Sequence, residues 1–270
     1  MTHLQSRKTA LITGATSGIG FHCADLLALK GYDVVIIGRN EAKMNKAKAL
    51  LEKHPVQVHA LLLDLTQADS AQTIYDFCQQ KQLHIDILIC NAGMYMVQCL
   101  ADTPPKEIEK VVNLHVLNPS LLCHYFGKHM KEKREGHILI VSSLAAYTPF
   151  PTLSLYAGSK RYLSHLSHAI RSELKPYNVS VTNLCPGGVS TDFFPTIGSV
   201  IRLATRFHFM MTPQKVAQKA LKAMFKNKKK VTPGFYNRIL IALIPLLPQC
   251  IIDYLHTHTS FFSNQMDYEI

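Results

Sequence analysis

The chain has 270 residues, of which 47% are hydrophobic, a length and composition that suit one α/β domain with a substantial core. Its formal net charge of +11 raises the question of nucleic-acid binding. Much of the excess is local, because lysines cluster at Lys226 and 228–230, and a second basic group at 128–134 ends a predicted helix. No recognised nucleic-acid-binding module accompanies either cluster, so we expect no nucleic-acid partner.

The seven cysteines are scattered, without a Cys-x-x-Cys pair and without a metal-ligand spacing to the histidines. An odd, unpatterned set that falls mostly in predicted strands and helices indicates buried thiols in a reducing compartment. The first seven residues are polar and short, so we expect no secretory signal before the first strand. The sequence therefore predicts a cytoplasmic protein without a metal site.

Short apolar runs recur along the chain, and amphipathic segments separate them. This alternation predicts a Rossmann-type, doubly wound α/β fold, in which helices cover both faces of a parallel sheet within a single domain spanning 1–270. The predicted strands are Ala10–Thr13, Val34–Ile37, Val58–Leu63, Ile85–Ile89, His137–Val141 and Val179–Leu184.

A glycine-rich turn follows the first predicted strand and precedes an apolar helical stretch. Strand, glycine turn, helix and second strand together form the unit that places a pyrophosphate on a helix N-terminus. The glycines allow a tight turn and a close approach of the backbone to phosphate. The spacing of these glycines departs from the common dinucleotide fingerprint, but a second strand follows the helix at the expected distance, and this order favours a nucleotide site. The turn is Gly14-Ala15-Thr16-Ser17-Gly18-Ile19-Gly20.

The end of the second predicted strand indicates whether a bound dinucleotide would carry a 2′-phosphate. It carries Gly38-Arg39-Asn40, with no carboxylate until Glu41. An acidic residue there would bind the ribose hydroxyls and repel a 2′-phosphate, whereas an arginine accommodates that phosphate. Arg39 offers a forked donor suited to phosphate; the alternative is a strand-end arginine in solvent. We expect NADP(H) as the cofactor.

Tyr156 and Lys160 are four residues apart, so in a helix both side chains project from one face. A fixed cation favours phenolate, so we expect the pKa of Tyr156 to move from about 10 towards neutrality. Such a tyrosine exchanges a proton with an alcohol or carbonyl oxygen, and the nearby Ser143 hydroxyl polarises the same oxygen. The alternative is an ordinary Tyr/Lys pair on a solvated helix face.

Together these motifs resemble the short-chain dehydrogenase/reductase family in order and spacing, from about residue 8 to residue 192. The resemblance implies that Tyr156 is the general acid/base and that Ser143 positions the substrate oxygen. It also implies that Lys160 lowers the pKa of Tyr156 and holds the nicotinamide ribose. Ser142 is the neighbouring candidate, but the spacing to Tyr156 favours Ser143. The motifs are Thr13-Gly14-x-x-x-Gly18-x-Gly20, Asn91-Ala92-Gly93, Ser143, Tyr156-x-x-x-Lys160 and Pro186-Gly187.

The resemblance implies further cofactor contacts at the ends of later strands. Asp64-Leu65, after the third strand, resembles the pair that contacts adenine. Asn91-Ala92-Gly93, after the fourth strand, would contact the cofactor through its backbone and support the sheet. The turn Pro186-Gly187-Gly188-Val189 and Thr191 would lie against the nicotinamide carboxamide.

The sequence departs from the family pattern at one position, where the family usually has an asparagine. An asparagine usually precedes the strand that carries the serine, and it helps to hold a water that relays protons to the lysine. Ungapped counting places His115 there, flanked by Asn113 and Asn118, and Pro119 disturbs the helix enough to shift which residue faces inward. Either His115 performs the relay with its ring nitrogens, or Asn118 or Asn113 does, or His115 is a hydrogen-bonded core residue.

Residues 233–270 form an apolar C-terminal extension that follows the lysine cluster. Its unbroken apolar run is too short to span a bilayer and carries two prolines, Pro245 and Pro248. A basic patch beside an apolar helix fits peripheral contact with an anionic membrane surface. The alternative is a helix buried against the domain or against a second subunit of a homo-oligomer. The extension also resembles the DltE-like branch of the family, in which it would cover the active-site cleft.

These inferences predict an NADPH-dependent oxidoreductase that reduces an apolar or lipid-like ketone or aldehyde to an alcohol, with Tyr156 as the general acid. Residues 190–212 fall where the family carries its substrate lid. Two rival hypotheses place a non-catalytic NADP-binding regulator, or a membrane- or partner-binding adaptor, on the same fold. The lid residues expected to line the substrate's approach are Phe193, Phe194, Ile197, Phe207 and Phe209.

Overall fold

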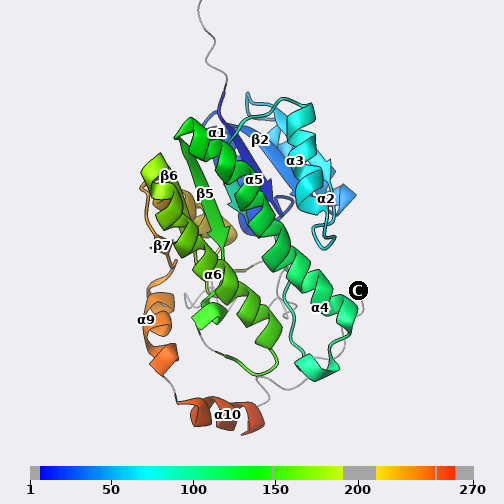
Figure 1. The fold of residues 1–270 in the computed structure, drawn as a ribbon. Coiled ribbons are helices and arrows are strands. Elements are labelled where there is room, and N and C mark those ends of the chain that lie inside the picture. Colours follow the sequence, from blue (N-terminus) through cyan, green and yellow to red (C-terminus); the bar gives the residue numbers. More distant parts are fainter. Residues whose placement is uncertain (1–6, 148, 191–210, 247, 259–270) are drawn as a thin grey trace, which may run out of the picture.

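One seven-stranded sheet forms the centre of the molecule in the computed structural model, which describes residues 7–147, 149–190, 211–246 and 248–258 (Figure 1). The strand order is β3-β2-β1-β4-β5-β6-β7, and each pair of neighbours is parallel. The order reverses between β1 and β4, the point where α/β sheets of this kind open a crevice for ligands. The strands are β1 (Thr9–Thr13), β2 (Asp33–Gly38), β3 (Val58–Leu62), β4 (Ile85–Cys90), β5 (Gly136–Val141), β6 (Val179–Leu184) and β7 (Lys230–Val231).

Helices cover both faces of this sheet (Figure 1), which confirms the predicted doubly wound fold. Successive strand residues point to opposite faces: Ile12 packs in the apolar core on one side, and its neighbour Leu11 packs in the core on the other. Helices α1 (Gly18–Leu29), α2 (Glu41–Leu51) and α8 (Pro213–Phe225) lie on the first side. Helices α3 (Ser70–Gln80), α5 (Asn118–Lys133) and α6 (Ser154–Leu174) lie on the second.

Helix α4 (Pro105–Val112) continues into α5 through one turn of π-helix, η2 (Asn113–Leu117). The backbone at both junctions keeps right-handed helical angles, so the three segments form one rod with a widened turn. Pro119 has no N–H to donate into the regular ladder, which explains the local change of hydrogen-bond pattern. The widened turn rotates the residues that follow relative to those of α4.

The last two described helices are short: α9 (Phe235–Leu243) and α10 (Gln249–His258), at the end of the molecule away from α3 (Figure 1). The single-turn elements are η1 (Leu100–Asp102), η3 (Leu144–Tyr147), η4 (Lys175–Tyr177) and η5 (Ile244–Leu246). Among the described residues, no helix is both long and apolar enough to cross a bilayer.

Candidate active site

A cavity of about 470 Å³ opens where the loops leave the carboxyl ends of the strands. Residues from motifs far apart in the sequence meet there, because a parallel sheet brings the ends of all its strands to one edge. The sequence-predicted residues that line this cavity are Gly14, Thr16, Ser17, Gly18, Ile19, Arg39, Asp64, Leu65, Asn91, Ala92, Gly93, Ser143, Tyr156, Lys160, Pro186, Gly187 and Val189.

The glycine turn wraps tightly between β1 and the start of α1. Gly14 and Gly18 have φ angles of 65° and 57°, a left-handed conformation that side-chain-bearing residues rarely adopt. Gly20 does not line the cavity. A Cβ there would lie 2.2 Å from the carbonyl oxygen of Gly14, so its role in this structure is to let α1 pack against the turn.

Asn91 joins the end of β4 to the end of β1. Its amide Nδ2 donates to the carbonyl oxygens of Thr13 (3.0 Å) and Gly14 (3.1 Å). The Thr13 hydroxyl in turn accepts hydrogen bonds from the backbone N–H groups of Asn91 (2.9 Å) and Ala92 (3.1 Å). This network fixes the two strand ends at the crevice, as expected for a motif that supports the sheet.

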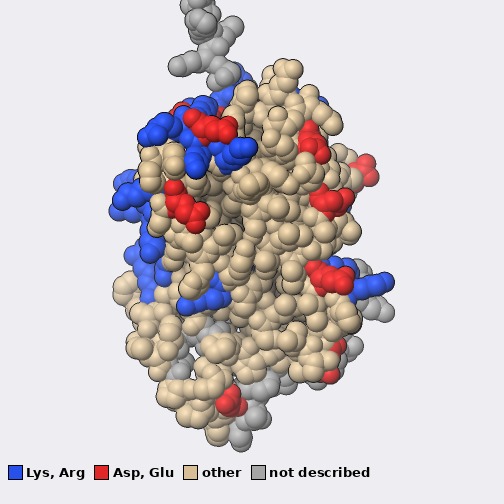
Figure 2. Space-filling model, in the orientation of Figure 1, with Lys and Arg blue, Asp and Glu red and all other residues tan. Residues whose placement is uncertain are grey.

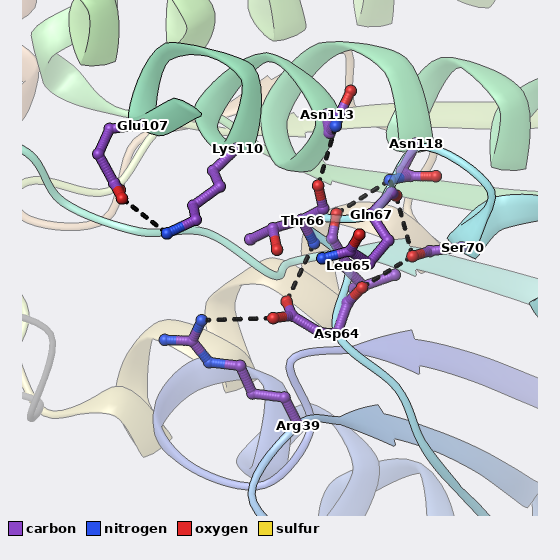
Figure 3. Close-up of polar contacts among 10 residues, drawn as sticks. All are labelled: Arg39, Asp64, Leu65, Thr66, Gln67, Ser70, Glu107, Lys110, Asn113 and Asn118. Atoms are coloured by element: carbon purple, nitrogen blue, oxygen red, sulfur yellow. Dashed lines mark hydrogen bonds and ion pairs between the residues drawn. The ribbon is translucent and has the colours of Figure 1, made fainter. Parts of the chain in front are cut away.

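The Arg39 end of the cavity is cationic and open to solvent. The side chain of Arg39 is 68% exposed and forms a 3.9 Å ion pair with Asp64 (Figure 3). Asp64 also accepts a hydrogen bond from the backbone N–H of Thr66 at 3.0 Å. Asn40 caps α2 by accepting from the backbone N–H of Lys43 at 2.8 Å, which directs the first turn of α2 along the cavity wall.

Tyr156 and Lys160 occupy the other end, on the buried face of α6. Both are almost fully buried, and the Lys160 ammonium nitrogen lies 5.8 Å from the centre of the Tyr156 ring. The Lys160 ammonium donates to the carbonyl oxygen of Val141, the last residue of β5, at 3.3 Å. Ser143 hydrogen-bonds with the Tyr156 phenol, whereas the Ser142 hydroxyl is 2.7 Å from the Asn183 side chain. This arrangement favours Ser143 over Ser142.

The electrostatics of this pair differ from the sequence-based expectation. Burial raises the pKa of Tyr156 to about 12, although the hydrogen bond from Ser143 opposes the rise. Burial also lowers the pKa of Lys160 to about 8. The pKa of this tyrosine therefore lies above its ordinary value in this structure and does not fall towards neutrality as expected, because loss of hydration at the buried phenol is the largest contribution.

His115 lies beside this pair, fully buried in the π-helical turn η2. Its Nε2 accepts the backbone N–H of Met94 at 3.0 Å, so the ring proton is on Nδ1, 2.9 Å from the Ser159 hydroxyl. Ser159 donates in turn to the carbonyl oxygen of Tyr156 at 2.8 Å. Burial, and then the Lys160 charge, hold the pKa of His115 well below its usual value, so the ring is neutral.

Neither Asn113 nor Asn118 lines the cavity, and both hydrogen-bond with the loop after β3 (Figure 3). Asn113 donates to the carbonyl oxygen of Thr66 at 2.9 Å. Asn118 donates to the carbonyl oxygens of Leu65 (2.9 Å) and Gln67 (2.8 Å) and accepts from the N–H of Ala71 (2.9 Å). Of the three candidates for the family asparagine position, only His115 reaches the tyrosine and lysine.

Gly93 separates His115 from Lys160. A Cβ added at Gly93 would lie 3.1 Å from His115 Nε2 and 3.2 Å from the Lys160 ammonium nitrogen. A side chain at this position would therefore press on both His115 and Lys160. Near Tyr156 the surroundings are apolar, because Leu153, Ala157 and partly buried Tyr95 and Phe150 pack around it.

The remaining expectations concern the substrate lid (190–212) and the C-terminal extension (233–270). Thr191, Phe193, Phe194, Ile197, Phe207 and Phe209 lie outside the described residues, as does most of 190–212. The described part of the tail reaches the cavity at one point: a Cβ on Gly187 would lie 2.4 Å from the Asn237 side chain. Asn237 is itself fixed by donating to the carbonyl oxygen of Pro233 at 2.7 Å.

Several cavity residues were not predicted from the sequence. Most are immediate neighbours of predicted motifs at strand ends, so the rule that ligands bind at the carboxyl edge would have found them. These residues are Gly38, Asn40, Lys43, Leu63, Thr66, Met94, Leu114, Val141 and Ser142.

The parallel sheet, the glycine turn at its switch point and the tyrosine/lysine pair define a dinucleotide-binding oxidoreductase. Residues 8–200 match the short chain dehydrogenase family, and the chain belongs to that family. It is 32% identical over 189 residues to human "Dehydrogenase/reductase SDR family member 2, mitochondrial", a match that covers 70% of this chain and 67% of the human protein. It is also 34% identical to the Bos taurus SDR family member 4, over 69% of this chain and 67% of that protein.

Solved structures share the fold at lower identity. A short-chain dehydrogenase from Sphingobium yanoikuyae in complex with NADPH superimposes with a TM-score of 0.76 at 22% identity, over 97% of this chain and 98% of that one. A 7β-hydroxysteroid dehydrogenase gives a TM-score of 0.83 at 22% identity, over 92% and 96% of the two chains. The curated relatives named above are dehydrogenase/reductase family members, so the DltE-like branch stays a prediction.

Proposed function

We propose that this protein is a cytoplasmic NADPH-dependent reductase that converts an apolar or lipid-like ketone or aldehyde to an alcohol. The observation that carries the proposal is that one cavity contains a candidate proton-transfer site at one end and a candidate phosphate-binding arginine at the other. Ser143 and Tyr156 are hydrogen-bonded at one end with Lys160 beside them, and Arg39 lies at the other end beyond the glycine turn. The family uses nicotinamide cofactors, and the choice of NADPH and of the substrate class is ours.

The residues present fit a phosphorylated dinucleotide. The left-handed Gly14 and Gly18 leave backbone exposed at the start of α1, where a pyrophosphate would bind. Arg39 and Lys43 supply positive charge where a 2′-phosphate would lie, and Lys160 would hold the nicotinamide ribose. The related structure from Sphingobium yanoikuyae contains NADPH, which agrees with this choice. When bound, NADPH supplies the hydride that adds to the carbonyl carbon.

The protein's own groups handle the proton. With a pKa of about 12, the Tyr156 phenol is protonated at neutral pH and therefore carries a proton for the carbonyl oxygen. Ser143 would hydrogen-bond with the same oxygen. Lys160, with a pKa of about 8, is mostly charged at pH 7 and offsets the negative charge that develops on the tyrosine oxygen. His115 stays neutral and positions α6 through Ser159.

The apolar substrate class follows from the surroundings of Tyr156. Leu153, Ala157, Tyr95 and Phe150 form an apolar cluster around the phenol, and the Tyr95 and Tyr156 rings meet edge to face at 5.1 Å. A polar substrate would lose hydration there without compensating hydrogen bonds. One solved structure with the same fold is a 7β-hydroxysteroid dehydrogenase, whose name gives a hydroxysteroid as its substrate, and this agrees with the assignment.

Tyr156→Phe tests the proposal. We expect wild-type protein to oxidise NADPH with members of a panel of apolar ketones and aldehydes, and the variant to lose about 10²–10⁴-fold in kcat/KM while still binding NADPH. Tyr162→Phe is the matched control, because Tyr162 is on the same helix but hydrogen-bonds with Ser120 outside the cavity. Equal rates for Tyr156→Phe and wild type would refute the mechanism. NADPH binding without turnover by wild type would favour the non-catalytic regulator.

A further inference from the structure

The two C-terminal helices expose an unusually apolar surface, which we call the tail surface. It consists of large side chains on α9, η5 and α10, and two of them, Phe235 and Leu246, are 71% and 75% exposed. Buried residues in this region are few: within the described side chains from 235 to 254, only Asn237 and Ile252 are buried. The tail surface comprises Phe235, Tyr236, Ile239, Leu240, Leu243, Leu246, Ile251 and Tyr254.

Positive charge gathers immediately beside the tail surface. We call this group the basic edge: exposed Lys228 and Lys229 with Lys230 at the β7 edge of the sheet, Arg161 on α6 and Arg238 on α9. Figure 2 shows lysine and arginine side chains along the left edge of the molecule, above the tan surface of the terminal helices.

Two members of the basic edge, from different elements, share one aromatic ring. The Lys230 ammonium and the Arg161 guanidinium both lie over the Tyr147 ring, at 4.5 Å and 5.6 Å from its centre. None of the carboxylates in the described part of the chain forms an ion pair with the five residues of the basic edge. Between 235 and 254 the one acidic residue is Asp253, which accepts a hydrogen bond from Gln249 at 3.0 Å.

We propose that the tail surface and the basic edge together dock on an anionic lipid bilayer. Exposed apolar side chains on short helices insert at the boundary between headgroups and acyl chains, and lysines beside them attract anionic headgroups. A second copy of this chain carries the same excess of positive charge, +11, whereas anionic headgroups would neutralise the basic edge. The charge pattern therefore favours lipid as the partner.

Docking in this way would place the cavity at the membrane. Asn237 of α9 packs against Gly187, which lines the cavity, so the tail surface begins next to the Tyr156 end of the site. If the proposed function is correct, an apolar substrate reaches Tyr156 directly from the lipid. The docking itself needs neither cofactor nor turnover, so its test is independent of the reductase proposal.

Sedimentation of the full chain with vesicles tests the docking. We expect the protein to sediment with vesicles of phosphatidylcholine and phosphatidylserine, to sediment much less with phosphatidylcholine alone, and to be released by added salt. Lys229→Gln with Lys230→Gln should lower the partition coefficient by about fivefold per lysine. The control, Lys46→Gln with Lys53→Gln, removes the same charge from exposed positions around α2.

Leucine substitutions test the apolar contribution. Leu243→Ser with Leu246→Ser should abolish most binding, whereas Leu29→Ser with Leu62→Ser, at comparably exposed leucines elsewhere, should leave binding unchanged. The thermal midpoint of each variant establishes that it is folded. The proposal is overturned if wild type fails to sediment with anionic vesicles or if both tail variants bind like wild type. It is also overturned if the leucine variants instead convert a dimer to a monomer in light scattering.

Discussion

The geometry of the ion pair between Arg39 and Asp64 supports the proposal that Arg39 binds the 2′-phosphate of NADPH. The guanidinium is 3.9 Å from its partner and largely exposed, so a phosphate could compete for it without disturbing the core. Asp64 does not bind Arg39 in a bidentate pair, because the two side chains share one contact of 3.9 Å and not two short hydrogen bonds. The forked donor thus stays accessible for a 2′-phosphate.

Arg39→Asp should therefore change cofactor selectivity. We expect NADPH affinity to fall by about 10–100-fold, because a charge-assisted contact is replaced by repulsion, while NADH affinity changes little. Fluorescence titration with each cofactor measures both. Lys46→Asp on α2, outside the cavity, makes the same charge change and should leave both affinities unaltered. An unchanged ratio of the two affinities in Arg39→Asp would contradict NADP(H) selection by this residue.

The lowered pKa of Lys160 predicts a pH dependence. Lys160 is charged below about pH 8 and neutral above it, so kcat/KM for NADPH should fall as the pH rises through about 8. Tyr156, with a pKa of about 12, stays protonated across this range, and His115 stays neutral. A single transition is expected as a result.

A pH profile of kcat/KM checks this assignment. Lys160→Arg keeps its charge throughout, so whatever activity remains should show no transition near pH 8. A wild-type profile that is flat to pH 9.5 or that rises through pH 8 would be inconsistent with Lys160 as the titrating group, because the pKa of about 8 requires a fall.

At the scale of elements, the six predicted strands are present, each within one residue of its predicted bounds. Their apolar runs are bounded by turn residues and lie in a sheet buried on both faces, where the sequence signal is strongest. Strand β7 was missed because it has two residues, Lys230 and Val231, and follows a lysine run. A strand so short is formed by pairing with β6 rather than by its own sequence.

The π-helical turn could not be predicted from periodicity. A regular helix assigns one face to each offset, but the widened turn changes that assignment between α4 and α5. Sequence counting therefore left His115, Asn113 and Asn118 as alternatives. Their tertiary contacts separate them, because both asparagines bind the loop after β3 and the histidine binds Met94 and Ser159.

The two asparagines offer a matched test of this separation. Asn118→Ala removes three hydrogen bonds that join α5 to the loop after β3 and to the start of α3, so the free energy of unfolding should fall by about 3 kcal/mol. Asn113→Ala removes one and should cost about 1 kcal/mol. Urea denaturation measures both. Neither variant should change kcat, and a large loss of kcat with intact stability would place that asparagine in the proton relay.

At the scale of the whole molecule, the cavity is assembled by topology. Its residues run from Gly14 to Val189 in sequence and meet because every strand ends at one edge. The order and spacing of the motifs were enough to predict that these residues lie together, because a parallel sheet brings the carboxyl ends of its strands to one edge. The raised pKa of Tyr156 and the neutral state of His115 were not predictable, because both depend on burial by residues from several elements.

The central claim is that hydride goes from NADPH to a carbonyl carbon while Tyr156 provides the proton. Its most direct test supplies NADPH with deuterium at both C4 positions together with the ketone that wild type reduces fastest, and the alcohol is analysed by mass spectrometry. We predict one deuterium on the carbinol carbon with wild type, and very little product with Tyr156→Phe. An alcohol without carbon-bound deuterium, or equal labelled product from both proteins, would contradict the account.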